Sequence, residues 1–216
     1  MPLCREHQIP FVPVLQLLKS FVPELPMPAG CDVFQLLWCP REHQEDSFLP
    51  KLMACWRKLG DIKGGATLEP KYDDDAMGFE VNECVLTREE VVEYPYLHSL
   101  SSEESDQIEA WEDGHPLQQS LEVEPLYQYL LSTCPGTKVG GYPDFGGQDD
   151  FSPKEDHWQY LLTLADGEWD GGSKARWMPE GASWAEGHHV GTYLKESVNL
   201  FFDARNPDDW KVVGAR

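Results

Sequence analysis

Four residues in the first fifth of the chain have the types and spacings of metal ligands. Cys4 and His7 form a C-x2-H pair in CREH, and Cys39 and His43 form a C-x3-H pair in CPREH. Two thiolates and two imidazoles are a tetrahedral ligand set for zinc, and each spacing lets both members of a pair reach one ion. The four residues are therefore a candidate structural zinc site. In the alternative interpretation, Cys39 is a core thiol, His43 is a surface residue and the N-terminal turn is frayed.

Two apolar runs connect these pairs. FVPVLQLL follows the first pair and VFQLLW precedes the second. Pro13 disfavours a helix interior, and the Pro-rich link before Gly30 is predicted to be a loop, so we predict two strands. If the strands pair antiparallel, the start of the first lies beside the end of the second. That pairing would bring all four ligands together.

Three later segments have mixed patterns. Residues 48–59 fit a helix or a strand, and residues 125–131 do so as well. Residues 60–78 are rich in Gly and Asp and are predicted to be an exposed loop. Val85 and Leu86 suggest a strand, and Thr87 with Glu90 matches a capping box for a short helix that Pro95 would end.

The most regular helical pattern runs from residue 101 to 114. Ser101 or Ser102 can cap it, and Gly114 can end it. Its apolar residues are only Ile108 and Trp111, which predicts a surface helix. Towards the C-terminus, the runs WQYLLTL and VNLFFDAR predict two more strands.

Composition narrows the classes of function. The 216 residues include 38 Asp and Glu but only 17 Lys and Arg, a net charge of −21, which disfavours nucleic acid and anionic membranes. A basic protein partner would instead be attracted. The chain has no apolar run long enough to span a membrane, and its N-terminus lacks the pattern of a secretory signal. We therefore expect a cytoplasmic protein whose six cysteines are reduced.

The first and last segments share a plan. In each, an apolar opener follows a turn that carries His7 or His157, and a second apolar run closes the segment. This weak repeat predicts one α+β, β-rich domain over 1–216, with duplicated halves of about 1–112 and 113–216 and one or two surface helices.

Five stretches together resemble the YwqG-like family, a bacterial domain of unknown function, and are most similar to its actinobacterial-type members. They are AGCDVFQLLWCPREH (29–43), CVLTREEVVEYP (84–95), KVGGYPDF (138–145), HWQYLLTLADGEWDGG (157–172) and VNLFFDARNPDDW (198–210). The resemblance implies an α+β fold with much sheet and an internal duplication, and it supplies no catalytic residues. Some relatives occur near bacterial toxin systems, which implies an immunity or protein-binding role.

The chain departs from similar members at the openers. Those members carry a C-x-x-C pair there in one or both halves, as in a zinc knuckle. Here the first half has Cys4 and His7, and the second half has PKEDHW without a cysteine. The departure predicts a metal site in the first half only.

Other candidate groups carry weaker patterns. Cys134 has no sequence pattern that ties it to a histidine, as a nucleophile would need. Asp166, Glu168 and Asp170 lack the full ligand set of a calcium loop and are interpreted as a turn. The pair His188–His189 is interpreted as a surface turn.

The function that we expect is non-enzymatic: an acidic protein-binding module, immunity-like against a basic toxin in its sharpest form. Two alternatives stay open. One is a hydrolase-like enzyme with a pocket between the halves and a zinc ion or a carboxylate such as Asp170 or Asp203 as its working group. The other is a zinc-stabilised scaffold without chemistry.

Overall fold

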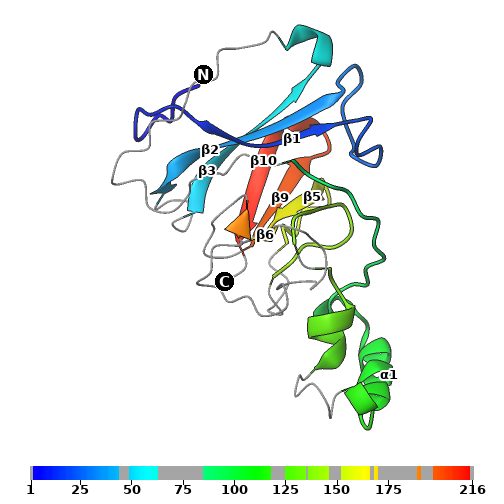
Figure 1. The fold of residues 1–216 in the computed structure, drawn as a ribbon. Helices are drawn as coiled ribbons and strands as arrows, with labels where there is room; N and C mark the ends of the chain where they lie inside the picture. The colour runs from blue at the N-terminus through cyan, green and yellow to red at the C-terminus, as the bar shows by residue number, and fades with distance from the viewer. Residues whose placement is uncertain are drawn as a thin grey trace.

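Two antiparallel sheets form the framework of the chain in the computed structural model (Figure 1). The structure describes residues 2–43, 49–62, 85–117, 125–134, 136–145, 152–165, 168–169, 189–190 and 197–214. Part of the exposed loop expected at 60–78 lies outside these ranges.

The first sheet has the order β1-β2-β3, with β1 at Val12–Leu18, β2 at Val33–His43 and β3 at Leu49–Arg57. Both strands predicted on either side of the Pro-rich link are confirmed, and they pair antiparallel with Val12 opposite Trp38. The ambiguous segment 48–59 is a strand for most of its length, because β3 pairs along the free edge of β2 from Val33–Arg57 to His43–Leu49.

The second sheet has the order β10-β9-β5-β4. Its strands are β4 (Lys138–Val139), β5 (Trp158–Leu164), β9 (Val198–Asp203) and β10 (Asn206–Gly214). The predicted strands correspond to β5 and β9, which pair antiparallel with Trp158 opposite Asp203. A separate two-stranded ladder joins β6 (Glu168–Trp169) to β8 (His189–Val190).

One apolar core lies between the two larger sheets. Leu36 and Trp38 of β2 belong to the same buried cluster as Leu162 of β5 and Leu200 of β9. The indole N–H of Trp56 also donates to the carbonyl oxygen of Pro207 across 3.0 Å, which links β3 to the start of β10. The two sheets are thus held together mainly by apolar burial.

Helix α1, at Ser102–Glu112, confirms the helix expected at 101–114. Ser101 caps it in a capping box with Glu104, in which each side chain bonds to the backbone N–H of the other residue. Gly114 follows with φ at +97°, a conformation that glycine adopts without a steric penalty. In Figure 1, α1 lies at the opposite end of the molecule from the N-terminal turn.

The strand at Val85–Leu86 and the helix from Thr87 to Pro95 are not present, and both predictions are wrong. Residues 85–96 form a segment without regular secondary structure instead. The side chain of Glu93 accepts hydrogen bonds from the backbone of Cys134 (2.5 Å) and Tyr142 (3.0 Å) and pairs with Lys138 (2.6 Å). These long-range contacts favour the observed backbone over the helix that the capping box predicts.

The remaining helical structure is short. Residues Leu59–Asp61 and Leu97–Ser99 form 3₁₀ turns, and the ambiguous segment near 125–131 contains a π-helical turn at Tyr127–Leu131. The described residues are therefore rich in strand with one α-helix, which agrees with the α+β class in its coarse form. Among them, no helix has the length and apolar character to cross a membrane.

Candidate metal centre

The four predicted ligands come together at one end of the first sheet. One ligand atom from each of Cys4, His7, Cys39 and His43 lies within 4.8 Å of all the others. Sγ of Cys4 is 3.6 Å from Nε2 of His43, and Nδ1 of His7 is 3.3 Å from Sγ of Cys39. Sγ of Cys4 is also 3.9 Å from Nδ1 of His7. The group is therefore a cluster that could hold a metal ion.

A tight N-terminal turn places the first pair. The backbone N–H of Cys4 donates to Ile9 (2.8 Å), and the N–H of Gln8 donates back to Cys4 (2.9 Å). Gln8 has φ at +57°, the left-handed conformation that reverses the chain at this point. Leu3 and Pro10 form a bridge below the turn. This geometry directs Cys4 and His7 to the same side.

A bulge in β2 places the second pair. Residues four apart on a regular strand lie roughly 13 Å apart, too far to share an ion. Here β2 advances four residues from Trp38 to Glu42, while β3 advances only two, from Leu52 to Pro50. The extra residues bend the strand, as bulges do, and this bend lets Cys39 and His43 converge.

Glu6 contacts the outer nitrogen of both histidines. Nδ1 of His43 lies 2.8 Å from one carboxylate oxygen of Glu6, and Nε2 of His7 lies 3.7 Å from the other. If each outer nitrogen carries the proton, the inner nitrogens, Nε2 of His43 and Nδ1 of His7, direct their lone pairs into the cluster. Metal-binding histidines commonly have such a carboxylate partner.

Burial shifts the pKa values of two residues of the cluster, Cys39 and His7. Cys39 and His43 are 0% and 1% exposed, so the alternative that places His43 on the surface is wrong. Burial raises the pKa of the Cys39 thiol to about 12, although a hydrogen bond from the backbone of Arg41 opposes this. Burial, and then His43, lower the pKa of His7. Metal binding would thus release the thiol proton of Cys39 and meet a neutral His7.

The donor set fits zinc. Bond lengths of about 2.3 Å to sulfur and about 2.0 Å to nitrogen give a tetrahedron with edges of roughly 3.3 to 3.8 Å. The sulfur–nitrogen separations of 3.3, 3.6 and 3.9 Å are close to these edges. Two thiolates also cancel the charge of a divalent ion, which suits a buried site.

In the second sheet, the end of β9 holds an ion pair. Asp203, at the end of β9, accepts from the guanidinium of Arg205 at 3.1 and 2.9 Å, and Nε2 of His157 lies 3.8 Å away. The hydrogen bonds from Arg205 lower the pKa of Asp203 to about 2. A carboxylate held ionised in this way is a poor general acid or base near neutral pH.

The other candidate groups are not brought together into a site by the described residues. The backbone N–H of Cys134 donates a hydrogen bond to the side chain of Glu93. Asp166, Asp170 and His188 lie outside the described residues, and Glu168 and His189 are described only as parts of β6 and β8. None of the five cysteines in the described ranges, at positions 4, 31, 39, 55 and 134, forms a disulfide bond.

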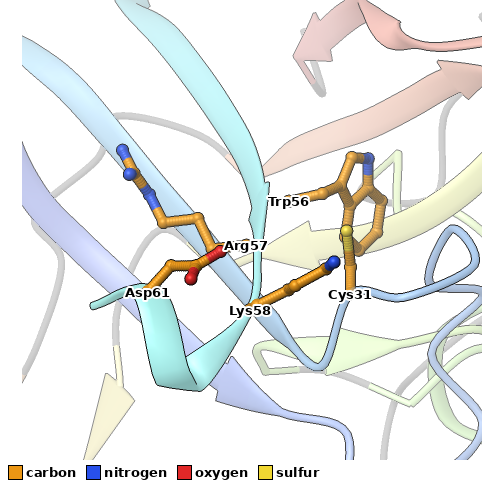
Figure 2. A pocket seen from close by; sticks show the side chains of 5 residues that line it. All are labelled: Cys31, Trp56, Arg57, Lys58 and Asp61. Atoms are coloured by element: carbon orange, nitrogen blue, oxygen red, sulfur yellow. The ribbon is translucent and has the colours of Figure 1, made fainter.

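A pocket of about 310 Å³ lies at the end of β3, far along the sheet from the metal cluster (Figure 2). It is lined by Cys31, Trp56, Arg57, Lys58 and Asp61. Figure 2 shows Lys58 extending toward Cys31 while Arg57 extends to the other side. Its lining contains one carboxylate and no histidine, so it resembles a surface hollow more than a catalytic pocket.

Sequence reasoning named the four residues that the structure brings together, but it missed Glu6. Glu6 lies between Cys4 and His7 in CREH and is visible in the sequence, yet its contact with His43 depends on the bend in β2. Comparison of the chain with protein-family models, with curated proteins and with solved structures found no match.

Proposed function

We propose that the protein is a non-enzymatic binding module of the cytoplasm whose N-terminal turn is held on the first sheet by a structural zinc ion. The observation that carries the zinc part is the convergence of Cys4, His7, Cys39 and His43 within 4.8 Å. A reducing compartment suits it, because the thiols must remain free to bind the ion.

A structural role is favoured over a catalytic one. Four protein ligands complete the tetrahedron, whereas catalytic zinc sites keep one position for water or substrate. Cys4, Cys39 and His43 are all buried, which leaves little access for a substrate.

The ion would supply stability where apolar burial is small. The cluster around Cys4, Phe11 and Cys39 is separate from the main core and contains few buried residues. A metal bond network that joins residues 4–7 to residues 39–43 would tie this turn to the sheet, as zinc does in small domains.

Metal analysis after purification in reductant tests the zinc site. We expect about one zinc per chain in the natural protein, and loss of that zinc in Cys39→Ser. Cys55→Ser is the matched control, because this half-buried thiol lies on β3 outside the cluster and the variant should keep the metal. A natural protein that takes up no zinc, or a Cys39→Ser variant that keeps it, would contradict the proposal.

The binding part of the proposal rests on charge. A net charge of −21 favours a basic partner and accelerates its encounter. In its sharper form, the protein is immunity-like and neutralises a basic toxin, a role suggested by the resemblance to the YwqG-like family. Affinity capture from a bacterial lysate should retain a basic protein at low ionic strength and release it at high ionic strength. Retention of none would count against this form.

An internal duplication is part of the same proposal. The orders β1-β2-β3 and β5-β9-β10 are alike, with the closing strand in the centre of each antiparallel triple. The turn before the opener and the end of the closer carry metal ligands in the first half. In the second half, the corresponding positions carry His157 and Asp203, and Arg205 supplies the positive charge that pairs with Asp203.

A further inference from the structure

We propose that a groove along α1 is the docking site for a basic amphipathic helix of a partner protein; this inference rests on the proposed binding function and locates it. The α1 groove has a volume of about 420 Å³. Its apolar lining comes from Tyr94, Pro95, Leu100, Ile108, Trp111 and Tyr127, and its polar lining from Glu104 and Gln107.

One face of α1 forms the first wall. Glu104, Gln107, Ile108 and Trp111 are spaced i, i+3, i+4 and i+7, which places them in one row along the helix. The second wall comes from the segment around Tyr94–Leu100 and from Tyr127. The groove therefore runs beside a helical row, the geometry in which a second helix can present its own row of apolar side chains.

Aromatic side chains are left exposed at this groove. Tyr94 is 55% exposed and Trp111 is 46% exposed. Aromatic residues are enriched at the centres of protein interfaces, where they bury a large area at low entropic cost. Their exposure here gives a partner an apolar anchor point.

Hydrogen bonds hold the two walls in place before any partner arrives. The hydroxyl of Tyr127 donates to the carbonyl of Pro95 across 2.7 Å, and the buried carboxylate of Glu112 accepts from the backbone N–H of Tyr127. The side-chain oxygen of Gln128 also accepts from the backbone of Leu97 at 2.9 Å. A groove fixed in this way loses less entropy on binding.

The charge around the groove selects the class of partner. Residues 89–137 contain 11 Asp and Glu and neither Lys nor Arg, so they contribute about half of the net charge of −21. The nearest cations along the chain, Arg88 and Lys138, already pair with Glu90 and Glu93. An apolar groove lined by the carboxylate of Glu104, in a stretch of chain without Lys or Arg, is complementary to a helix that alternates apolar residues with Lys and Arg.

Fluorescence anisotropy with a synthetic probe tests the proposal. The probe is a labelled amphipathic helix of about 14 residues, four helical turns, built from Leu and Lys. Two companions keep its length: one replaces Lys by Glu, and one replaces Leu by Ala, which preserves helix propensity. We expect saturable binding of the Leu–Lys probe at low ionic strength and at least about tenfold weaker binding of each companion.

Matched variants locate the binding. Glu103→Gln with Glu104→Gln removes the groove-lining charge of Glu104 and that of its neighbour in the first turn of α1, and it keeps the capping box, which accepts Gln in place of Glu. Asp106→Asn with Glu109→Gln removes two charges from the opposite face of the same helix. We expect the first pair, and Trp111→Ala, to weaken probe binding about tenfold and the second pair to change it less than about threefold. Circular dichroism confirms that each variant folds.

The outcomes separate this inference from the proposed function. Equal weakening by the two double variants, or equal binding of the Leu–Lys and Ala–Lys probes, would reduce the effect to net charge and overturn the groove. A basic lysate protein that the natural chain and the groove variants retain equally would also overturn the groove while leaving the binding function intact. The zinc stoichiometry is measured independently of all these results.

Discussion

Glu6 is the residue that most clearly distinguishes a metal site from a chance grouping of thiols and imidazoles. A core that merely packed Cys4, Cys39 and His43 would have no use for a carboxylate that is half exposed and contacts two histidines. Its place on the outer nitrogens fixes which nitrogen of each imidazole faces inward. The organisation of the cluster is thus compatible with a bound metal ion.

Glu6→Ala should lower zinc affinity without removing a ligand. Loss of a carboxylate partner of a metal-bound histidine typically reduces affinity about 10- to 100-fold. Competition with a chromophoric chelator measures the change, and Asp208→Asn on β10, an exposed acid in the other sheet, is the control. Unchanged affinity in Glu6→Ala would show that the histidines are oriented by other contacts.

At the scale of the secondary-structure elements, Glu93 is the residue that connects distant parts of the chain. It joins segment 85–96 to residues 134–142. It is buried, and it joins the backbone of Cys134 and Tyr142 and the ammonium group of Lys138. Gly141 makes this arrangement feasible, since a Cβ atom there would collide with the Glu93 carboxylate. Gly140 beside it faces open space.

Gly141→Ala and Gly140→Ala form a matched pair. Both glycines have positive φ, at +73° and +71°, so alanine at either position should cost about 1 to 2 kcal/mol in backbone strain. Only Gly141→Ala also displaces Glu93 from its donors, which should add roughly 2 kcal/mol. Urea denaturation measures both free energies of unfolding. Equal values would mean that the carboxylate moves aside without loss.

Secondary-structure elements are predictable from the sequence where the pattern that specifies them lies within the element itself. Strands β1, β2, β5 and β9 are each visible as an apolar run in the sequence. The capping residues of α1 lie next to the helix in the sequence, so they are visible as well. Strand β3 is ambiguous, because its half-buried residues fit both periods and pairing with β2 decides between them. Strand β10 is missed, since it starts in polar NPDDW. The capping box at Thr87 misleads because the partners of Glu93 lie more than 40 residues away.

The candidate site is predictable to a similar depth. Ligand types and spacing identify Cys4, His7, Cys39 and His43, and antiparallel pairing of two adjacent strands explains why they meet. Neither the bulge that lets Cys39 and His43 converge nor the contact from Glu6 to His43 has a local pattern. Both depend on how β2 bends against β3.

In the molecule as a whole, the Cys/His cluster and the main core are separate groups of buried residues. The core between the two sheets contains residues of β1, β2, β5 and β9, whereas the cluster lies at one end with only a small apolar group around it. The α1 groove lies at the other end (Figure 1). Removal of the metal should therefore act locally.

Hydrogen exchange before and after chelation tests this separation. Residues 2–11 and the end of β2 should lose protection, because their hydrogen bonds depend on a turn with little buried surface. Strands β5, β9 and β10 should keep theirs. Loss of protection throughout both sheets would mean that the metal is required for the whole fold.

Zinc K-edge X-ray absorption of the purified, reduced protein tests the central claim most directly, because it reports the ligands as well as the presence of the ion. The account predicts two sulfur ligands at about 2.3 Å and two nitrogen ligands at about 2.0 Å. A first shell of oxygen and nitrogen alone, or sulfur coordination that persists when Cys4 and Cys39 are both replaced by Ser, would contradict it.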